Sequence, residues 1–156
     1  MNDIINLEQK KVLLKKQACF SQFTEEEIDV LADLLVATHF AAGETIVTEC
    51  DLVVSVYFIV SGKASVRHVT IKEDHTHNIE CVATLSAGET IGLNETGFYS
   101  VSGVRTATVV AIDDMVLLQL SVAEFHGFSL VYSHVNEVMR KSAETFLDIT
   151  DGGFHL

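Results

Sequence analysis

The sequence predicts an α+β fold in which helices, a run of short strands and further helices follow one another along the chain. Apolar residues recur at helical spacing near both ends, whereas the middle alternates apolar and polar residues between glycine-containing turns. Such an order is typical of domains whose helical and sheet parts are segregated, and the short strands indicate a sandwich or a barrel-like roll. With 156 residues, the chain is expected to form a single domain over residues 1–156.

The composition excludes several classes of partner. The formal net charge of −12 would repel phosphate backbones and anionic lipids, so we expect neither a nucleic-acid nor a membrane partner. Cys19, Cys50 and Cys81 contain no C-x-x-C pair, which is typical of reduced thiols rather than of a zinc or redox motif. No apolar run approaches the roughly 18 residues of a membrane span, and no signal peptide is evident, so a cytoplasmic location is expected.

Two helices are expected in the N-terminal segment, residues 1–40. The first covers residues 3–16, with three apolar residues on one face: Ile5, Val12 and Leu13. The second begins at a capping box formed by Thr24 and Glu27, and it ends near Ala37. Its apolar residues recur at helical spacing: Ile28, Leu31, Leu34 and Leu35.

The middle segment, residues 41–121, is expected to form the roll. Strands are predicted at residues 44–48, 55–60, 63–71, 78–85, 104–112 and 115–120. Helices return over residues 122–150, starting at a second capping box, Ser121 to Glu124. An apolar stripe follows on the last helix: Val131, Val135, Val138, Met139 and Phe146. This stripe either packs on the roll or forms a homodimer interface.

Arg105 is the residue of the predicted roll that indicates a bound anion. It is the only Lys or Arg between Lys72 and Arg140, and in its strand it shares a face with small or apolar residues. An arginine that points inward must find an anion, because an unpaired buried charge is costly.

The glycines just upstream fit an anion site. Gly88 and Gly92 allow backbone N–H groups to approach a ligand, and a short helix starting near Gly92 would add donors suited to a phosphate. The alternative is that Arg105 pairs with a carboxylate of the chain itself and that the glycines are ordinary turn residues. Three carboxylates are candidates: Glu89, Glu95 and Asp113.

Six segments, taken in order, resemble the cyclic-nucleotide-binding domain family, which includes the sensor domains of catabolite-activator-type regulators. They are FSQFTEEE (20–27), GETIV (43–47), VYFIVSG (56–62), LSAGETIG (85–92), RTATVVA (105–111) and MVLLQLSVAEF (115–125). The resemblance implies an antiparallel double-stranded β-helix, which is a jelly-roll-like β-roll, flanked by helices. It also implies a non-enzymatic, regulatory sensor that binds cAMP, cGMP or a similar anion and signals through its C-terminal helices.

The resemblance assigns roles to particular residues. Gly92 would open the phosphate-binding cassette, Arg105 would hold the cyclic phosphate, and Thr106 would contact the phosphate or a guanine base. The cassette continues with Leu93, Asn94 and Glu95. The lid candidates on the C-terminal helix are Tyr132 and Val135.

The chain also departs from the family pattern. Leu93 stands where family members have a glutamate that accepts the ribose 2′-hydroxyl, and a leucine accepts no hydrogen bond. The stretch 92–105 is several residues longer than usual, so Glu95 could take over the ribose contact, and Cys50 replaces a turn glycine. The alternative function is therefore a degenerate domain that no longer binds nucleotide and serves as an interaction or dimerisation module.

Other site classes fit less well. His75, His77 and Glu80 have metal-ligand spacing as in a cupin, the third alternative, but the polar loop around them indicates a solvated hairpin tip and no metal site. No nucleophile motif is present, so no enzymatic activity is expected. No DNA-binding unit follows Phe125, so we expect a stand-alone sensor that needs no cofactor and acts on an effector protein the sequence does not name.

Overall fold

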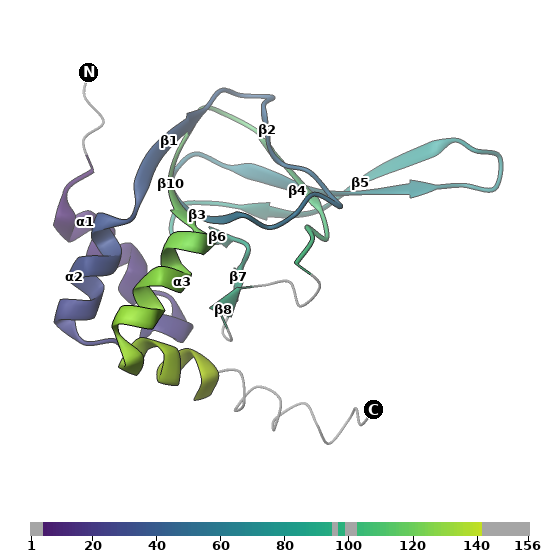
Figure 1. Cartoon of the computed structure of the whole chain (residues 1–156). Coiled ribbons are helices and arrows are strands. Elements are labelled where there is room, and N and C mark those ends of the chain that lie inside the picture. Colours follow the sequence, from purple (N-terminus) through teal and green to yellow (C-terminus); the bar gives the residue numbers. More distant parts are fainter. Residues whose placement is uncertain (1–4, 95–96, 99–102, 142–156) are drawn as a thin grey trace.

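The computed structural model describes residues 5–94, 97–98 and 103–141, with helices at one end of a β-roll and a long hairpin at the other (Figure 1). The helices are α1 (Leu7–Lys15), the 3-10 helix η1 (Ala18–Phe20), α2 (Glu25–Asp33) and α3 (Val122–Val131), and residues 133–141 are helical too. The strands are β1 (Val36–Phe40), β2 (Thr45–Val47), β3 (Ser55–Ser61), β4 (Ala64–Ile71), β5 (His77–Leu85), β6 (Thr90–Ile91), β7 (Leu93–Asn94), β8 (Gly97–Phe98), β9 (Thr108–Ala111) and β10 (Met115–Ser121).

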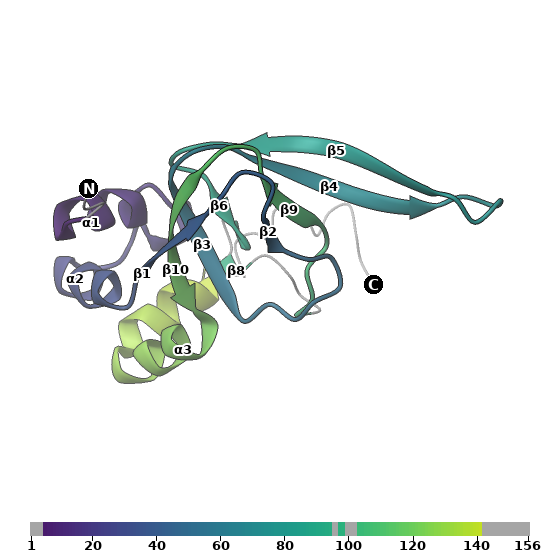
Figure 2. The same cartoon turned by 90° about the horizontal axis from the view of Figure 1, so that it is seen from above.

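The strands form two facing sheets, and every pairing between named strands is antiparallel (Figure 2). One sheet has the order β1-β10-β3-β6 and the other β2-β9-β4-β5, while β7 and β8 form a small separate hairpin. The expected α+β architecture, an antiparallel roll flanked by helices, is therefore confirmed.

The helix starts follow the capping signals in the sequence. At α2, the Thr24 hydroxyl accepts a hydrogen bond from the Glu27 amide, and the Glu27 carboxylate accepts one from the Thr24 amide. Asn6 and Gln9 form the same arrangement at α1, which the sequence analysis did not identify. At α3, the Ser121 side chain caps the Glu124 amide.

Two expectations about the N-terminal segment were wrong, the first only in part. Ile5 and Leu13 pack against the helix-side core as expected, but Val12 is 58% exposed and the fully buried side chain of α1 is that of Leu14. The second helix ends at Asp33 rather than near Ala37, and β1 follows at once and pairs with β10. The roll therefore starts at residue 36 and not at 41, because the β-branched and aromatic residues of β1 pair with a strand about 80 positions away in the chain.

Two strands separate the core into two layers. On β3, Val56 and Phe58 face the helices, whereas Tyr57 and Ile59 face the space between the sheets. On β10 the helix-facing residues are Leu118 and Leu120, and the roll-facing residues are Met115 and Leu117. Because alternate strand residues point to opposite faces, these two strands place the helices directly behind the wall of the roll.

The last helix is held by apolar packing and by a hydrogen bond between His134 and Glu27. Val135 and Val138 are buried in the helix-side core, but Val131, expected in the same stripe, is 76% exposed. Phe146 lies outside the described residues. His134 Nδ1 lies 2.9 Å from Oε1 of the buried Glu27, so the start of this helix contacts the start of α2. Hydrogen bonds from Thr24 and His134 lower the pKa of the Glu27 carboxyl against the opposing effect of burial.

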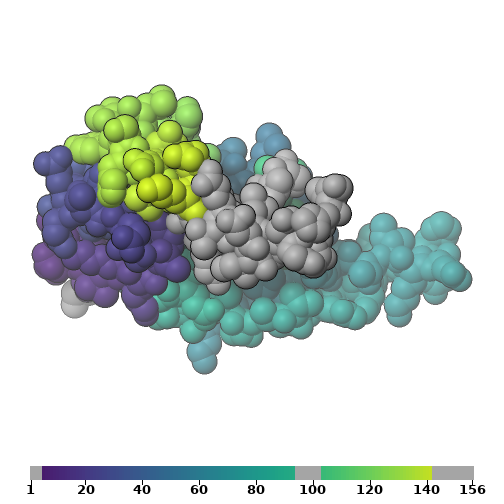
Figure 3. Space-filling model, turned by 90° about the horizontal axis from the view of Figure 1, so that it is seen from below, coloured from purple at the N-terminus to yellow at the C-terminus, as the bar shows by residue number. Residues whose placement is uncertain are grey.

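Strands β4 and β5 extend far beyond the roll as a hairpin arm opposite the helices (Figure 3). Most side chains of β5 are exposed, and so are His75 and His77 at the tip. In the described part of the chain, no helix is long and apolar enough to cross a membrane.

Cys50 adopts a backbone conformation that favours glycine, with φ at +76°. We expect Cys50→Gly to raise the free energy of unfolding by about 0.5–1 kcal/mol, since relief of left-handed strain outweighs the added freedom of the unfolded chain. Chemical denaturation would measure the change. Cys50→Ala keeps the Cβ atom and removes the thiol, so an equal gain in the alanine variant would show that the backbone explanation is wrong.

Candidate functional site

A cavity of about 250 Å³ opens between the sheets beside the β6–β7 turn. Its described wall is mainly aliphatic and includes one charged side chain, that of Arg105. The lining residues are Val47, Val53, Val66, Leu85, Thr90, Ile91, Gly92, Leu93, Val104, Arg105, Thr106, Ala107 and Val109. The volume is slightly below the range of typical small-molecule sites, roughly 300–1,000 Å³, so a compact ligand fits best.

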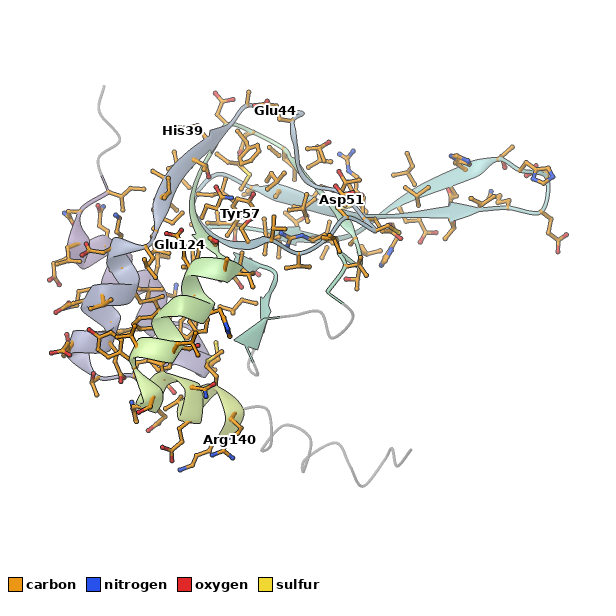
Figure 4. All side chains as sticks on the ribbon, viewed as in Figure 1. His39, Glu44, Asp51, Tyr57, Glu124 and Arg140 are labelled. Atoms are coloured by element: carbon orange, nitrogen blue, oxygen red, sulfur yellow. The ribbon has the colours of Figure 1, made fainter. Side chains whose placement is uncertain are left out.

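Arg105 is only 8% exposed, as expected, but the strand predicted over residues 104–112 is limited to β9, so Arg105 lies before it and strand alternation does not explain its orientation. The Nη2 atom donates a 2.6 Å hydrogen bond to the backbone carbonyl of Ser55. Burial lowers the pKa of Arg105, while Tyr57 and Asp51, which both belong to the roll (Figure 4), act in the opposite direction. The guanidinium is therefore a partly desolvated charge at the wall of an apolar cavity.

The backbone around Arg105 is fixed from both sides. Its amide donates to the Asp51 carbonyl at 2.7 Å, and its carbonyl accepts from the Cys50 amide at 2.9 Å. Leu52 and Val104 form an isolated β-bridge next to these bonds. The loop between β2 and β3 thus fixes the backbone from which the Arg105 side chain extends.

Only glycine fits both the backbone conformation and the close surroundings of residue 92. Its φ is +93°, and a Cβ atom at this position would lie 2.9 Å from Nη1 of Arg105 and 3.1 Å from Cγ1 of Val56. Because only glycine avoids both the strain and the contact, the guanidinium can pack directly against the backbone at residue 92.

The segment after Gly92 differs from the expectation of a short helix. Leu93 and Asn94 form β7, which pairs with Gly97 and Phe98 of β8, so no helix N-terminus points at the cavity here. Alternating hydrogen bonds of a hairpin, rather than helical capping, organise the start of the cassette. The expected donors at a helix N-terminus are therefore absent from this described stretch.

Leu93 lies between the cavity and the helix-side core. Its side chain lines the cavity and is also part of the helix-side core together with Val135 and Phe58. Leucine at this position is thus explained by packing, since a carboxylate here would be buried among apolar groups.

Two of the three carboxylates considered as partners of Arg105 bind other groups. Glu89 accepts hydrogen bonds from the amide and hydroxyl of Ser86, and Asp113 caps the Lys63 amide. Within the described residues, no Asp or Glu oxygen forms an ion pair with Arg105. Glu95, the third carboxylate, lies outside the described residues.

Of the other predicted site residues, some line the cavity and others do not. Thr106 lines the cavity and is exposed, and Asn94 is described only as part of β7. Tyr132 and Val135, the lid candidates, do not line the cavity in this conformation, because both pack in or against the helix-side core.

Sequence reasoning missed part of the site. It did not identify Thr90, whose hydroxyl donates to the Leu93 carbonyl at 3.3 Å, or Ser55, whose carbonyl holds Arg105. It also missed the aliphatic wall, whose members come from β2, β4 and β9. These residues form ordinary strand patterns, and only the pairing of the strands brings them together.

The metal alternative gains no support. Among the residues that the structure describes, no three His, Cys, Asp or Glu side chains are grouped so that they could hold a metal ion. His75, with φ at +66°, turns the chain at the hairpin tip, far from the cavity lining.

Comparison with known proteins gives matches to one family. The family model described as "Cyclic nucleotide-binding domain" matches residues 37–130. A curated relative is the "Pycsar effector protein XpPycTIR" of Xanthomonas perforans, 32% identical over 119 residues. That match covers 74% of this chain but 35% of the relative, so the chain spans about a third of that protein's length.

Solved structures share the fold at low sequence identity. The N-terminal domain of a transcriptional regulator from Streptomyces coelicolor A3(2) has a TM-score of 0.75 and 21% identity, covering 92% of this chain and 96% of that one. The regulatory domain of Toxoplasma gondii PKA with cAMP has a TM-score of 0.69 and 18% identity, covering 99% of this chain and 56% of that one. Since the family model spans more than half of the sequence, the chain belongs to the cyclic nucleotide-binding domain family.

Proposed function

We propose that this chain is a non-enzymatic sensor domain that binds a cyclic nucleotide, cAMP or cGMP, or a similar anion, and signals through its C-terminal helices. The phosphate would lie on the cavity side of the Arg105 guanidinium, next to the backbone at Gly92, and the base would lie against the aliphatic wall.

One observation carries this proposal: a nearly buried guanidinium at the wall of an apolar cavity, whose hydrogen-bond acceptor among the described residues is the neutral carbonyl oxygen of Ser55. A buried charge without a counter-charge is costly, and a phosphate would supply that counter-charge through two parallel hydrogen bonds. Gly92, which carries no side chain, lets Nη1 approach the backbone, and both residues line the cavity in which such an anion would lie.

Two of the similar proteins support the proposed ligand and the proposed control of an effector. The Toxoplasma gondii structure is a complex with cAMP, and the Xanthomonas perforans relative is named an effector protein. We infer that the chain, which matches about a third of that relative, controls an effector that is a partner protein or a further segment.

Leu93 favours a second candidate function, that of a fold retained as an interaction or dimerisation module. Its side chain is part of the helix-side core and offers a ligand no hydrogen bond. The sensor function requires that the cavity binds an anion, whereas the interaction or dimerisation module does not.

Calorimetric titration with cAMP, cGMP and non-cyclic 5′-AMP distinguishes them. We expect saturable binding of one cyclic nucleotide with a dissociation constant below about 1 mM, and weaker binding of 5′-AMP. The same ligand should stabilise the protein by about 2.7 kcal/mol at a concentration a hundred times its dissociation constant, measured as a rise in Tm. If no nucleotide gives either calorimetric binding or a rise in Tm, the sensor function is wrong and the interaction or dimerisation module is the function that stands.

A further inference from the structure

We propose that the outer edge of strand β5 is a self-association surface, through which two copies of this chain pair their hairpin arms into one antiparallel sheet. The hairpin arm comprises residues 68–80, where β4 and β5 continue beyond the roll (Figure 2). The inference goes beyond both functions considered above, because it involves neither the cavity nor the C-terminal helices.

In the described part of the chain, two strands form the arm. Strand β9 pairs with β4 as far as Arg67, and beyond this residue β4 pairs with β5 up to Ile71 and His77. A two-stranded hairpin is marginally stable in water, whereas three or more strands with an apolar face are stable on their own. A further strand along β5 would therefore stabilise the arm.

The two faces of the arm have the opposite polarity to those of the roll. Val66 of β4 packs against the roll core, so alternation places His68 and Thr70 on that same side of the sheet, where polar residues follow the apolar one. Val69 and Ile71 lie on the outward side and are exposed. Apolar residues on the outward side add nothing to the roll core, so they indicate a contact outside this copy of the domain.

Strand β5 offers an edge to such a contact. Among the described strands it is the longest, with nine residues, and it lies at the outside of the order β2-β9-β4-β5. Ile79 faces Val69 across the hairpin and is exposed as well. Edge strands are commonly protected from further pairing by lysine or proline, and β5 contains neither residue. The backbone groups along this edge can therefore pair with another strand.

The sequence of the edge fits a second copy of itself. The register of β5 shifts at Val82, so the regular part of the edge is HNIEC, residues 77–81. Antiparallel pairing about a two-fold axis at Ile79 places this residue opposite its own copy, and Asn78 opposite Glu80 of the second copy. Within one copy the Asn78 amide already donates to Glu80 at 3.1 Å, and its second N–H can donate to the carboxylate across the axis.

Charge does not oppose this pairing. The chain has a net charge of −12, but Glu80 is the only Asp, Glu, Lys or Arg in residues 77–81, and in this register it faces an amide rather than its own copy. Because Val69 faces Ile79 within each arm, the contact also aligns two valines and two isoleucines in one row across four strands. A second copy thus supplies both the further strand and apolar neighbours for the outward side.

The oligomeric state of the full chain tests the proposal. Sedimentation velocity up to about 1 mM protein covers the weak association expected of an interface well below about 1,200 Å². We expect a monomer–dimer equilibrium that Ile79→Lys weakens about tenfold or more, since it places two lysines opposite each other. Ile71→Lys is the matched control, because Ile71 is 69% exposed and Ile79 is 63% exposed, both on the outward side, but Ile71 lies one strand away from the edge. Its effect should stay below about threefold.

A disulfide tests the predicted register. Ile79→Cys is made in a chain that also carries Cys50→Ala and Cys81→Ala, which removes the two exposed native thiols. Directly opposite residues of an antiparallel pair have Cα atoms about 4.5–5.5 Å apart, which a disulfide can span. Mild oxidation should therefore give a covalent dimer, at least about tenfold faster than Ile71→Cys in the same background. Circular dichroism would verify that every variant folds.

Three results would overturn the proposal: a monomer at every concentration, equal weakening by Ile79→Lys and Ile71→Lys, or equal cross-linking by the two cysteine variants. A dimer that dissociates in Val131→Lys and persists in Ile79→Lys would also overturn it, since Val131 is exposed at the end of α3. The substituted positions do not line the cavity, so each of these results leaves the sensor function standing. Failure to bind any nucleotide would likewise leave the self-association untouched.

Discussion

Arg105→Met is expected to weaken cyclic-nucleotide binding by about a hundredfold or more while leaving the unliganded protein folded. Hydrogen bonds to a charged group contribute about 1.5–3 kcal/mol each, and the two that a guanidinium makes to a phosphate would both be lost. The methionine side chain fills similar space with apolar atoms, so the cavity wall is retained.

The stability of the empty protein should change little in the same variant. The substitution removes one hydrogen bond, from Nη2 to the Ser55 carbonyl, but it also removes a charge whose burial is unfavourable. These effects oppose each other, and we expect a net change within about 2 kcal/mol.

Calorimetry and urea denaturation on the same preparations would measure both quantities. Arg67→Met is the matched control, since Arg67 lies on β4, bonds the Ser65 hydroxyl and does not line the cavity. Equal losses of affinity in the two variants, or unchanged affinity in Arg105→Met, would show that Arg105 does not hold the phosphate.

The largest loss of stability is expected from Phe20→Ala, at about 3–5 kcal/mol. The Phe20 ring is 1% exposed and lies 5.1 Å from Phe23, 6.5 Å from Phe58 and 6.0 Å from Phe125, measured between ring centroids. It therefore joins η1 to β3 and α3, and its loss would open a cavity where the helices meet the roll. A loss of this size is a large part of the total stability of a domain, about 5–15 kcal/mol.

Phe40→Ala provides the comparison. Phe40 is half-buried at the end of β1 and makes an edge-on ring contact with Tyr57, so a smaller loss is expected. Denaturant unfolding followed by circular dichroism measures both variants. If Phe20→Ala cost no more than Phe40→Ala, the packing of Phe20 would not be what fastens the helices to the roll.

Local signals in the sequence predicted much of the fold. The capping residues Thr24 and Ser121 placed the starts of α2 and α3, and the glycine turns separated the main strands. Strand β1 was missed because its apolar residues continue the pattern of the preceding helix, and only pairing with β10 makes it a strand. Leu14 was missed in α1 because the rotation of a short helix depends on the partner against which it packs.

The site was predictable where one residue carried the chemistry. Arg105 stood out as a lone cation among apolar neighbours, and Gly92 as a residue suited to close backbone approach. The hairpin of β7 and β8 and the bond from Arg105 to Ser55 were not predictable, since each depends on segments that meet only in the folded chain. The ligand-binding roles of all the predicted site residues stay predictions: Gly92, Leu93, Asn94, Glu95, Arg105, Thr106, Tyr132 and Val135.

The contact between His134 and Glu27 has a mechanical consequence. The Glu27 carboxylate is buried in the capping box of α2, so separating it from His134 would leave a desolvated negative charge with one partner fewer. A pivot of helix 133–141 about the bend at Tyr132 would therefore carry the N-terminal helices along rather than leave them behind. Helix 133–141, α1 and α2 would then move together relative to the roll.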